Sequence, residues 1–78
     1  MGFLAQEKYD SAYAYGIRLI GVDSTVPNGY LAAGVAQFYL GDRDEAKALL
    51  SRFIKLGGPS IDLQRAKTIL EQIDRENK

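Results

Sequence analysis

Four serines are among the side chains of this sequence that could act as nucleophiles. A serine attacks a substrate only when a neighbouring base removes its proton, and the usual base is histidine. The 78-residue chain contains no histidine and no cysteine. It also has no Gly-x-Ser-x-Gly turn and no glycine-rich loop that ends in a Lys-Ser/Thr pair. The sequence therefore predicts that the protein is not an enzyme and assigns no catalytic role to Ser11, Ser24, Ser51 or Ser60.

A short acidic group, Asp42, Asp44 and Glu45, could in principle hold a divalent cation, because such ions prefer several oxygen ligands. The spacing does not match a calcium-binding loop. Acidic residues at the beginning of a helix are explained by capping and by the helix dipole. We therefore expect no metal and no cofactor.

Composition excludes two further classes of partner. Ten basic and ten acidic residues give a formal net charge of +0, and no stretch concentrates lysine and arginine, so we expect no nucleic-acid partner. No window is apolar enough over a sufficient length for a membrane span or a signal peptide. The hydrophobic content of 46% is typical of a globular domain. The chain as given is expected to be soluble, without membrane association, and cytoplasmic.

Hydrophobic periodicity predicts an all-α protein, with no window that alternates like a strand. Helices are expected over 8–22, 27–40, 43–56 and from Ser60 onward. The stretch YLAAGVAQFYL in the second helix is apolar on every side, so this helix should be buried on more than one face. Asp42 and Glu45 predict a capping box before the third helix. The buried stripe of the first helix is expected to contain Tyr9, Ala12, Tyr13, Gly16, Ile17, Leu19 and Ile20, with the tyrosines mainly structural.

An internal repeat relates residues 10–20 to residues 44–54 at a shift of 34 positions. Five of these eleven positions are identical, against roughly one expected by chance. Paired helices at this period are typical of the tetratricopeptide repeat. The matching positions are Asp10/Asp44, Ala12/Ala46, Ala14/Ala48, Arg18/Arg52 and Ile20/Ile54.

The chain resembles the tetratricopeptide family in further positions. Gln37 and Gly16 depart from the family pattern, which has aromatic residues there. The resemblance implies antiparallel helix-turn-helix repeats of an α-α superhelix in one domain: a partial first repeat over 1–26, with 3–6 as the last turn of its A helix, a complete repeat over 27–59, and a capping helix over 60–78. The positions that fit the pattern are Tyr30, Ala33, Gly34, Gly41, Ala46, Leu50 and Pro59.

The resemblance also implies a function. The A helices of the family line a concave face that binds proteins or peptides, so the expected role is a non-catalytic protein–protein interaction module with an apolar binding face. A face that grips a terminal carboxylate would carry several basic and amide groups, and here only an asparagine qualifies. The alternatives are a terminal capping segment of a larger protein and a homodimer, both without a free groove. The binding residues predicted for the first reading are Asn28, Leu31, Val35, Phe38 and Tyr39.

Overall fold

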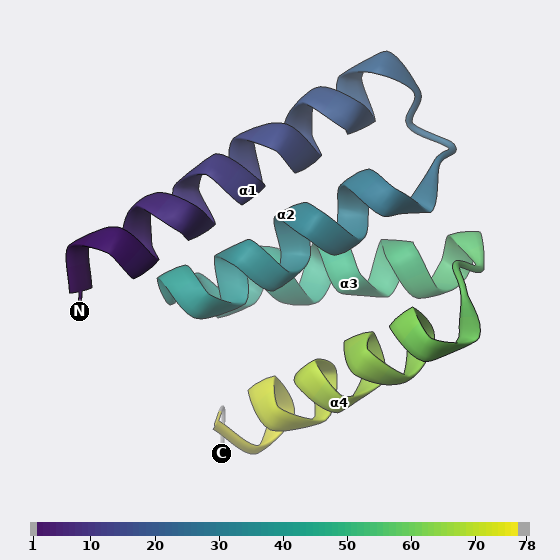
Figure 1. The fold of residues 1–78 in the computed structure, drawn as a ribbon. Helices are drawn as coiled ribbons and strands as arrows, with labels where there is room; N and C mark the ends of the chain where they lie inside the picture. The colour runs from purple at the N-terminus through teal and green to yellow at the C-terminus, as the bar shows by residue number, and fades with distance from the viewer. Residues whose placement is uncertain (1, 77–78) are drawn as a thin grey trace.

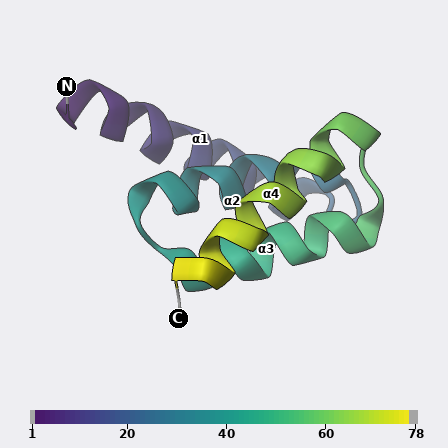
Figure 2. The same ribbon diagram turned by 90° about the horizontal axis from the view of Figure 1, so that it is seen from below.

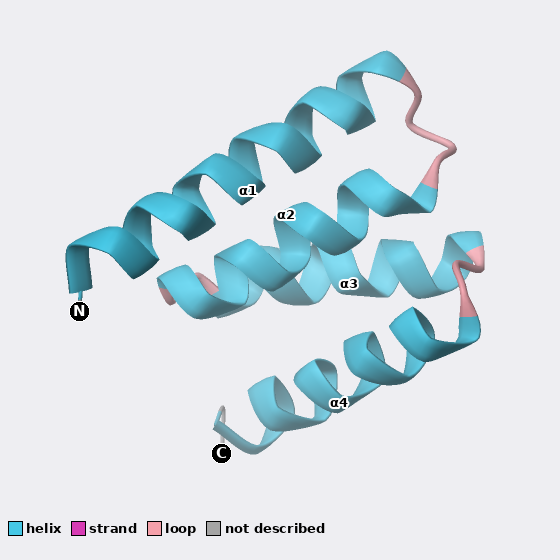
Figure 3. Ribbon diagram, viewed as in Figure 1, coloured by secondary structure: helices cyan, strands magenta, loops and turns pink. Residues whose placement is uncertain are grey.

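Four helices pack side by side with alternating direction in the computed structural model (Figures 1 and 3). The structure describes residues 2–76, with side chains from residue 8 onward, and this part of the chain contains no strand. Helix α2 packs against α1 on one side and α3 on another, α3 packs against α4, and α4 also contacts α2 (Figure 2). The all-α expectation is confirmed. The helices are α1 (Gly2–Val22), α2 (Pro27–Leu40), α3 (Arg43–Leu56) and α4 (Ser60–Glu76).

The first helix differs from the expectation that residues 3–6 end a separate A helix. Helix α1 is continuous from Gly2 to Val22. No glycine or proline occurs between Phe3 and Tyr15, so the backbone has no residue at which a helix would end. The beginning of the chain therefore extends the helix that follows it.

Glycines in the left-handed conformation end α2 and α3. Gly41 has a φ of 98° and Gly57 a φ of 78°, values that disfavour any side chain with a Cβ atom. Asp42 then begins α3, with its Oδ1 accepting a hydrogen bond from the backbone N–H of Glu45 at 3.1 Å. The reciprocal half of the predicted capping box is absent, because the carboxylate of Glu45 instead accepts a hydrogen bond from the hydroxyl of Tyr13.

The main core lies where α3 meets α2 and α4. Phe53, Leu50 and Ile73 are its largest fully buried side chains. Tyr30 and Phe38 join this cluster from α2, so α2 contributes to the core while also facing α1. Helix α2 has no charged side chain, so it can be buried on more than one face. The expectation for this helix is confirmed for the face toward α1 and the face toward the core.

Small residues bring α1 and α2 close together. A Cβ atom at Gly16 would lie 2.6 Å from the backbone nitrogen of Ala33 and 2.7 Å from the carbonyl oxygen of Gly29. A Cβ atom at Gly29 would lie 2.8 Å from the carbonyl oxygen of Gly16. The two backbones are therefore in direct contact at this point.

The opposite face of α1 has no helix against it among the described residues. Tyr15 and Val22 are 59% and 80% exposed there. Ile17, which was expected in the buried stripe, is 41% exposed, so that prediction is wrong for this residue. The reason is the direction of the side chains around the helix. Helix α2 contacts α1 along a narrow line at Gly16, and the side chain of the next residue, Ile17, points away from that line.

Candidate functional site

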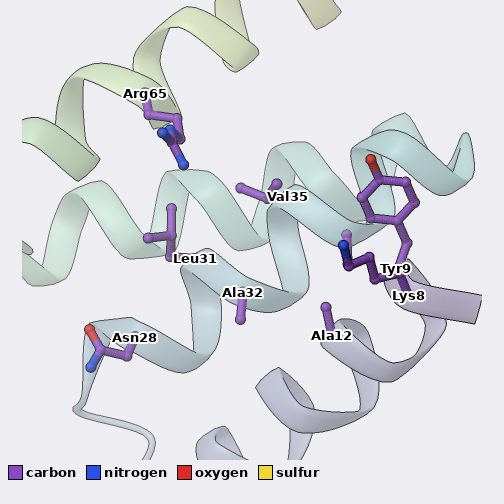
Figure 4. A pocket seen from close by; sticks show the side chains of 9 residues that line it. Lys8, Tyr9, Ala12, Asn28, Leu31, Ala32, Val35 and Arg65 are labelled. Carbon is purple, nitrogen blue, oxygen red and sulfur yellow. The ribbon is translucent and has the colours of Figure 1, made fainter. Parts of the chain in front are cut away.

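An open hollow of about 360 Å³ lies where α1, α2 and α4 face one another (Figure 4). Its size is at the lower end of the range for ligand pockets. Helix α2 supplies the floor, α1 one wall and α4 the other. The lining residues are Lys8, Tyr9, Ala12, Asn28, Leu31, Ala32, Val35, Ala36 and Arg65.

The floor is one face of α2. Asn28, Leu31, Ala32 and Val35 follow one another at steps of three, one and three residues, which places them along the same side of the helix. Pro27 occupies the first turn, where its missing N–H is not needed, and so begins the helix just before this face. Leu31, Ala32 and Val35 are half-buried rather than fully covered. The floor is therefore apolar and accessible.

The walls are basic. Lys8 on α1 and Arg65 on α4 are both exposed, and Arg65 extends from α4 toward α2 beside Leu31 (Figure 4). No acidic residue lines this hollow. Among the side chains from residue 8 to residue 76, the one ion pair joins Arg43 to Glu76. The guanidinium of Arg65 is thus positioned over an apolar floor without a carboxylate of this part of the chain beside it.

A second hollow, of about 540 Å³, continues along the same helix. It shares Val35 and Arg65 with the first hollow, so the two adjoin. We call the two together the α2 groove. The residues that line the second hollow are Val35, Phe38, Tyr39, Arg65, Thr68, Ile69 and Gln72.

Aromatic rings fix the end of the groove. Tyr39 on α2 stacks on Tyr9 of α1, with ring centroids 4.7 Å apart and planes 15° apart. Tyr39 also meets the ring of Phe38 edge-on at 5.3 Å, and the guanidinium of Arg43 lies 5.1 Å from the centroid of Phe38. Stacked and edge-on pairs of this kind add to the burial of their rings, so this end of α2 is held against α1 and α3.

The structure places the predicted binding residues as follows. Asn28, Leu31 and Val35 line the first hollow, and Val35, Phe38 and Tyr39 line the second. Phe38 is only 8% exposed and belongs mainly to the core, whereas Tyr39 is 55% exposed. The five residues therefore share one groove, although Phe38 offers it little surface.

Four residues in the walls of the first hollow were not among the predicted ones: Lys8, Tyr9, Ala12 and Arg65. Lys8 and Tyr9 precede Ala12 by four and three residues, a spacing that places all three near one face of α1. That spacing is a weak signal on its own. Arg65 has no signal in the sequence that separates it from other basic residues of α4, because the angle at which α4 crosses α2 decides which of them overhangs the groove.

Groups with shifted pKa lie outside the groove. The hydrogen bond to Glu45 is the main cause that raises the pKa of Tyr13, and burial adds to it. The hydrogen bonds from Thr25 lower the pKa of Asp23, and the hydrogen bond from Arg43 lowers the pKa of Glu76. None of these residues lines the groove. The described residues also contain no cluster of three or more acidic side chains that could hold a metal ion.

The chain was compared with protein-family models, with curated proteins and with solved structures, and no match was found in any of the three. None of the helices over residues 2–76 combines the length and the apolar character that crossing a membrane requires. The groove combines an apolar floor, basic walls and an aromatic end.

Proposed function

We propose that the protein is a non-catalytic protein–protein interaction module of the tetratricopeptide type, which binds a protein or peptide segment in the α2 groove. The observation that carries the proposal is the accessible apolar floor of α2, with Leu31 and Val35 half-buried and Tyr39 exposed between two basic walls. Helix α2 carries no charged side chain, and it is nevertheless left partly uncovered by α1, α3 and α4. A partner that covers this face would remove apolar surface from water, the main driving force in most protein association.

The repeat supports the type of module that we propose. The 34-residue shift relates α1 to α3, the two helices that pack on either side of α2. In the proposed arrangement α2 is an A helix, α3 its B helix and α4 the terminal cap, whose charged outer face suits the end of a solenoid. The A helix then forms the floor of the groove.

Selection of peptides from a random display library tests the binding role. The wild-type chain is the bait. Peptides that also bind a Val35→Arg variant are discarded, because their binding does not depend on the groove. Ile61→Arg is the matched control, because Ile61 is an apolar residue that is 76% exposed on α4 and does not line the groove. Circular dichroism and thermal denaturation establish that each variant is folded.

We expect peptides that bind the wild type and the Ile61→Arg control but not the Val35→Arg variant. One long cationic side chain in the middle of the floor should weaken binding by about tenfold or more, since residues at the centre of an interface dominate its affinity. If every retained peptide binds all three proteins equally, the groove is not the binding surface and the proposal is wrong.

The outer face of α1 supports the alternative in which the chain associates with another protein surface without using the groove. Tyr15 and Val22, seven residues apart and so on one side of the helix, are exposed there. A second copy of the chain, or a larger protein that the chain caps, would cover them. Sedimentation of the chain over a wide concentration range distinguishes the cases. Self-association through this face should disappear in a Tyr15→Glu variant, and a monomer at all concentrations rules the homodimer out.

A further inference from the structure

The walls and length of the α2 groove carry an inference about its occupant, which rests on the proposed binding role. The groove follows α2 from Asn28 to Tyr39, eleven residue steps, or roughly 16 Å at about 1.5 Å per residue. This distance equals about three turns of a second helix. It leaves room for apolar anchors at positions i, i+3 or i+4, and i+7 of a helical partner.

The backbone at the floor favours a helical occupant over an extended one. An extended peptide usually gains affinity through hydrogen bonds to an open strand edge. The described part of the chain has no strand, and the N–H and C=O groups in the middle of α2 are bonded within the helix. An extended peptide on this floor would gain no backbone hydrogen bonds from the middle of α2, whereas a helix satisfies its backbone internally.

The charges on the walls favour an acidic occupant. Lys8 and Arg65 belong to different helices and stand on either side of the apolar floor, and no acidic residue lines either hollow (Figure 4). The whole chain has a formal net charge of +0, so this local excess of positive charge is a property of the groove and not of the protein. Complementary charges at the edges of an apolar contact fix the register and select the partner.

We propose that the occupant of the α2 groove is an amphipathic helix of another protein, with apolar residues on one face and carboxylates along both edges of that face. The apolar residues fill the two hollows over Leu31 and Val35. A carboxylate on one edge pairs with Arg65, which lies between the hollows, and a carboxylate on the other edge pairs with Lys8. Asn28, at the start of the floor, offers an amide group for one further hydrogen bond.

The first test is the composition of the peptides that the selection with Val35→Arg isolates. We expect apolar residues at helical spacing, flanked by aspartate and glutamate, and a helical circular-dichroism signal that rises when the peptide binds. Peptides that depend on the groove but are neutral or basic, or that lack a helical period, would overturn this inference and leave the proposed binding role standing. If the selection yields no peptide that depends on the groove, the binding role itself fails, and the inference fails with it.

The second test measures the affinity of the selected peptides by fluorescence anisotropy with two double variants. Lys8→Glu with Arg65→Glu reverses both walls. Arg18→Glu with Lys67→Glu changes the net charge equally, on the same two helices, at exposed residues that do not line the groove. We expect the wall variant to weaken binding by about tenfold or more and the control by less than about twofold.

Salt separates the charge contribution from the apolar one. Exposed charges are screened more strongly as the Debye length falls from about 10 Å at 0.1 M to about 3 Å at 1 M salt. The wild-type affinity should therefore decrease with salt, and the affinity of the wall variant should not. Equal weakening in the wall and control variants, with the same salt dependence, would overturn the assignment of Lys8 and Arg65 to the occupant's carboxylates.

Discussion

Two interfaces of this small protein are built in opposite ways. Between α1 and α2, Gly16 and Gly29 let the two backbones touch, and added atoms would find no space. Where α3 meets α2 and α4, the large side chains of Leu50, Phe53 and Ile73 are fully buried and fill the core. The contact at Gly16 is therefore made by backbone, whereas this core is made by side chains.

This difference implies different tolerances to mutation. An interface built by side chains loses stability when atoms are removed, because a cavity remains. An interface built by backbone contact loses stability when atoms are added, because the helices must separate. The predictions below test this contrast, from the largest expected effect to the smallest.

Truncation of Phe53 should have the largest effect. Phe53 is 0% exposed at the centre of the α3–α4 interface, and replacing a buried phenylalanine by alanine typically costs about 3–5 kcal/mol. For a domain of this size that is a large part of a total stability of about 4–12 kcal/mol. Urea denaturation of Phe53→Ala measures the loss, and a loss below about 1 kcal/mol would contradict the assigned core.

Addition of one methyl group at Gly16 should come next. The new Cβ atom would lie 2.6 Å from the backbone nitrogen of Ala33, so α1 must move, at a cost of about 1–3 kcal/mol. This occurs although alanine is a better helix former than glycine by about 1 kcal/mol. Gly21→Ala is the control in the same helix, because a Cβ atom there meets nothing within 4 Å. The control should be neutral or slightly stabilising, and equal effects at both positions would refute the close contact.

Removal of the Tyr13 hydroxyl should have a smaller effect. Tyr13→Phe deletes the hydrogen bond that links α1 to Glu45 of α3, at a cost of about 1 kcal/mol at neutral pH. Because the pKa of Tyr13 is raised above its ordinary value of 10.0 in the folded protein, the bond stabilises the fold below that pH. This contribution is lost as the pH rises through the folded-state pKa. The wild type should therefore lose its advantage over Tyr13→Phe above about pH 10 in parallel urea titrations.

The ion pair between Arg43 and Glu76 should contribute least. Both side chains are about one third exposed, and solvent screens such pairs strongly. Glu76→Gln should leave the urea midpoint at pH 7 nearly unchanged. The pKa of Glu76 is lowered in the folded state, so whatever small stabilisation exists is present at neutral pH and is lost as the pH falls through that pKa. A clear shift of the midpoint at pH 7 would show that the α3–α4 interface depends on this pair as well as on its side-chain core.

The sequence predicted the helices well where the residues that begin or end a helix act locally. Pro27, Gly41, Asp42 and Gly57 act on their own backbone, and the bounds of α2 and α3 agree with the expected ranges. The partial A helix over residues 3–6 was wrong because it was inferred from the spacing of the repeat and not from a residue that ends a helix. The predicted hydrogen-bond donor to Glu45 was also wrong. Its carboxylate can accept a hydrogen bond from a local backbone N–H or from the hydroxyl of Tyr13, and only tertiary packing brings that hydroxyl near.

The groove could be anticipated in part. The face of α2 with Leu31 and Val35 was expected from the resemblance to the tetratricopeptide family, and these residues do line the hollow. The basic walls could not be anticipated, since Lys8 and Arg65 are far apart in the sequence and their positions depend on how α1 and α4 cross α2. Phe38 and Tyr39 are adjacent in the chain yet differ from 8% to 55% exposure, which composition cannot distinguish.

The contact at Gly16 is also the pivot about which a rotation of α1 would occur, and this pivot lies outside the groove. Lys8 lies eight residues before Gly16, about 12 Å along the helix, so a rotation of about 10° at the pivot would move Lys8 by roughly 2 Å. The position of the α1 wall thus depends in part on two glycines that do not line the groove. Under the proposed function, a single methyl group at Gly16 would consequently change which partner helices fit, without altering any residue that lines the groove.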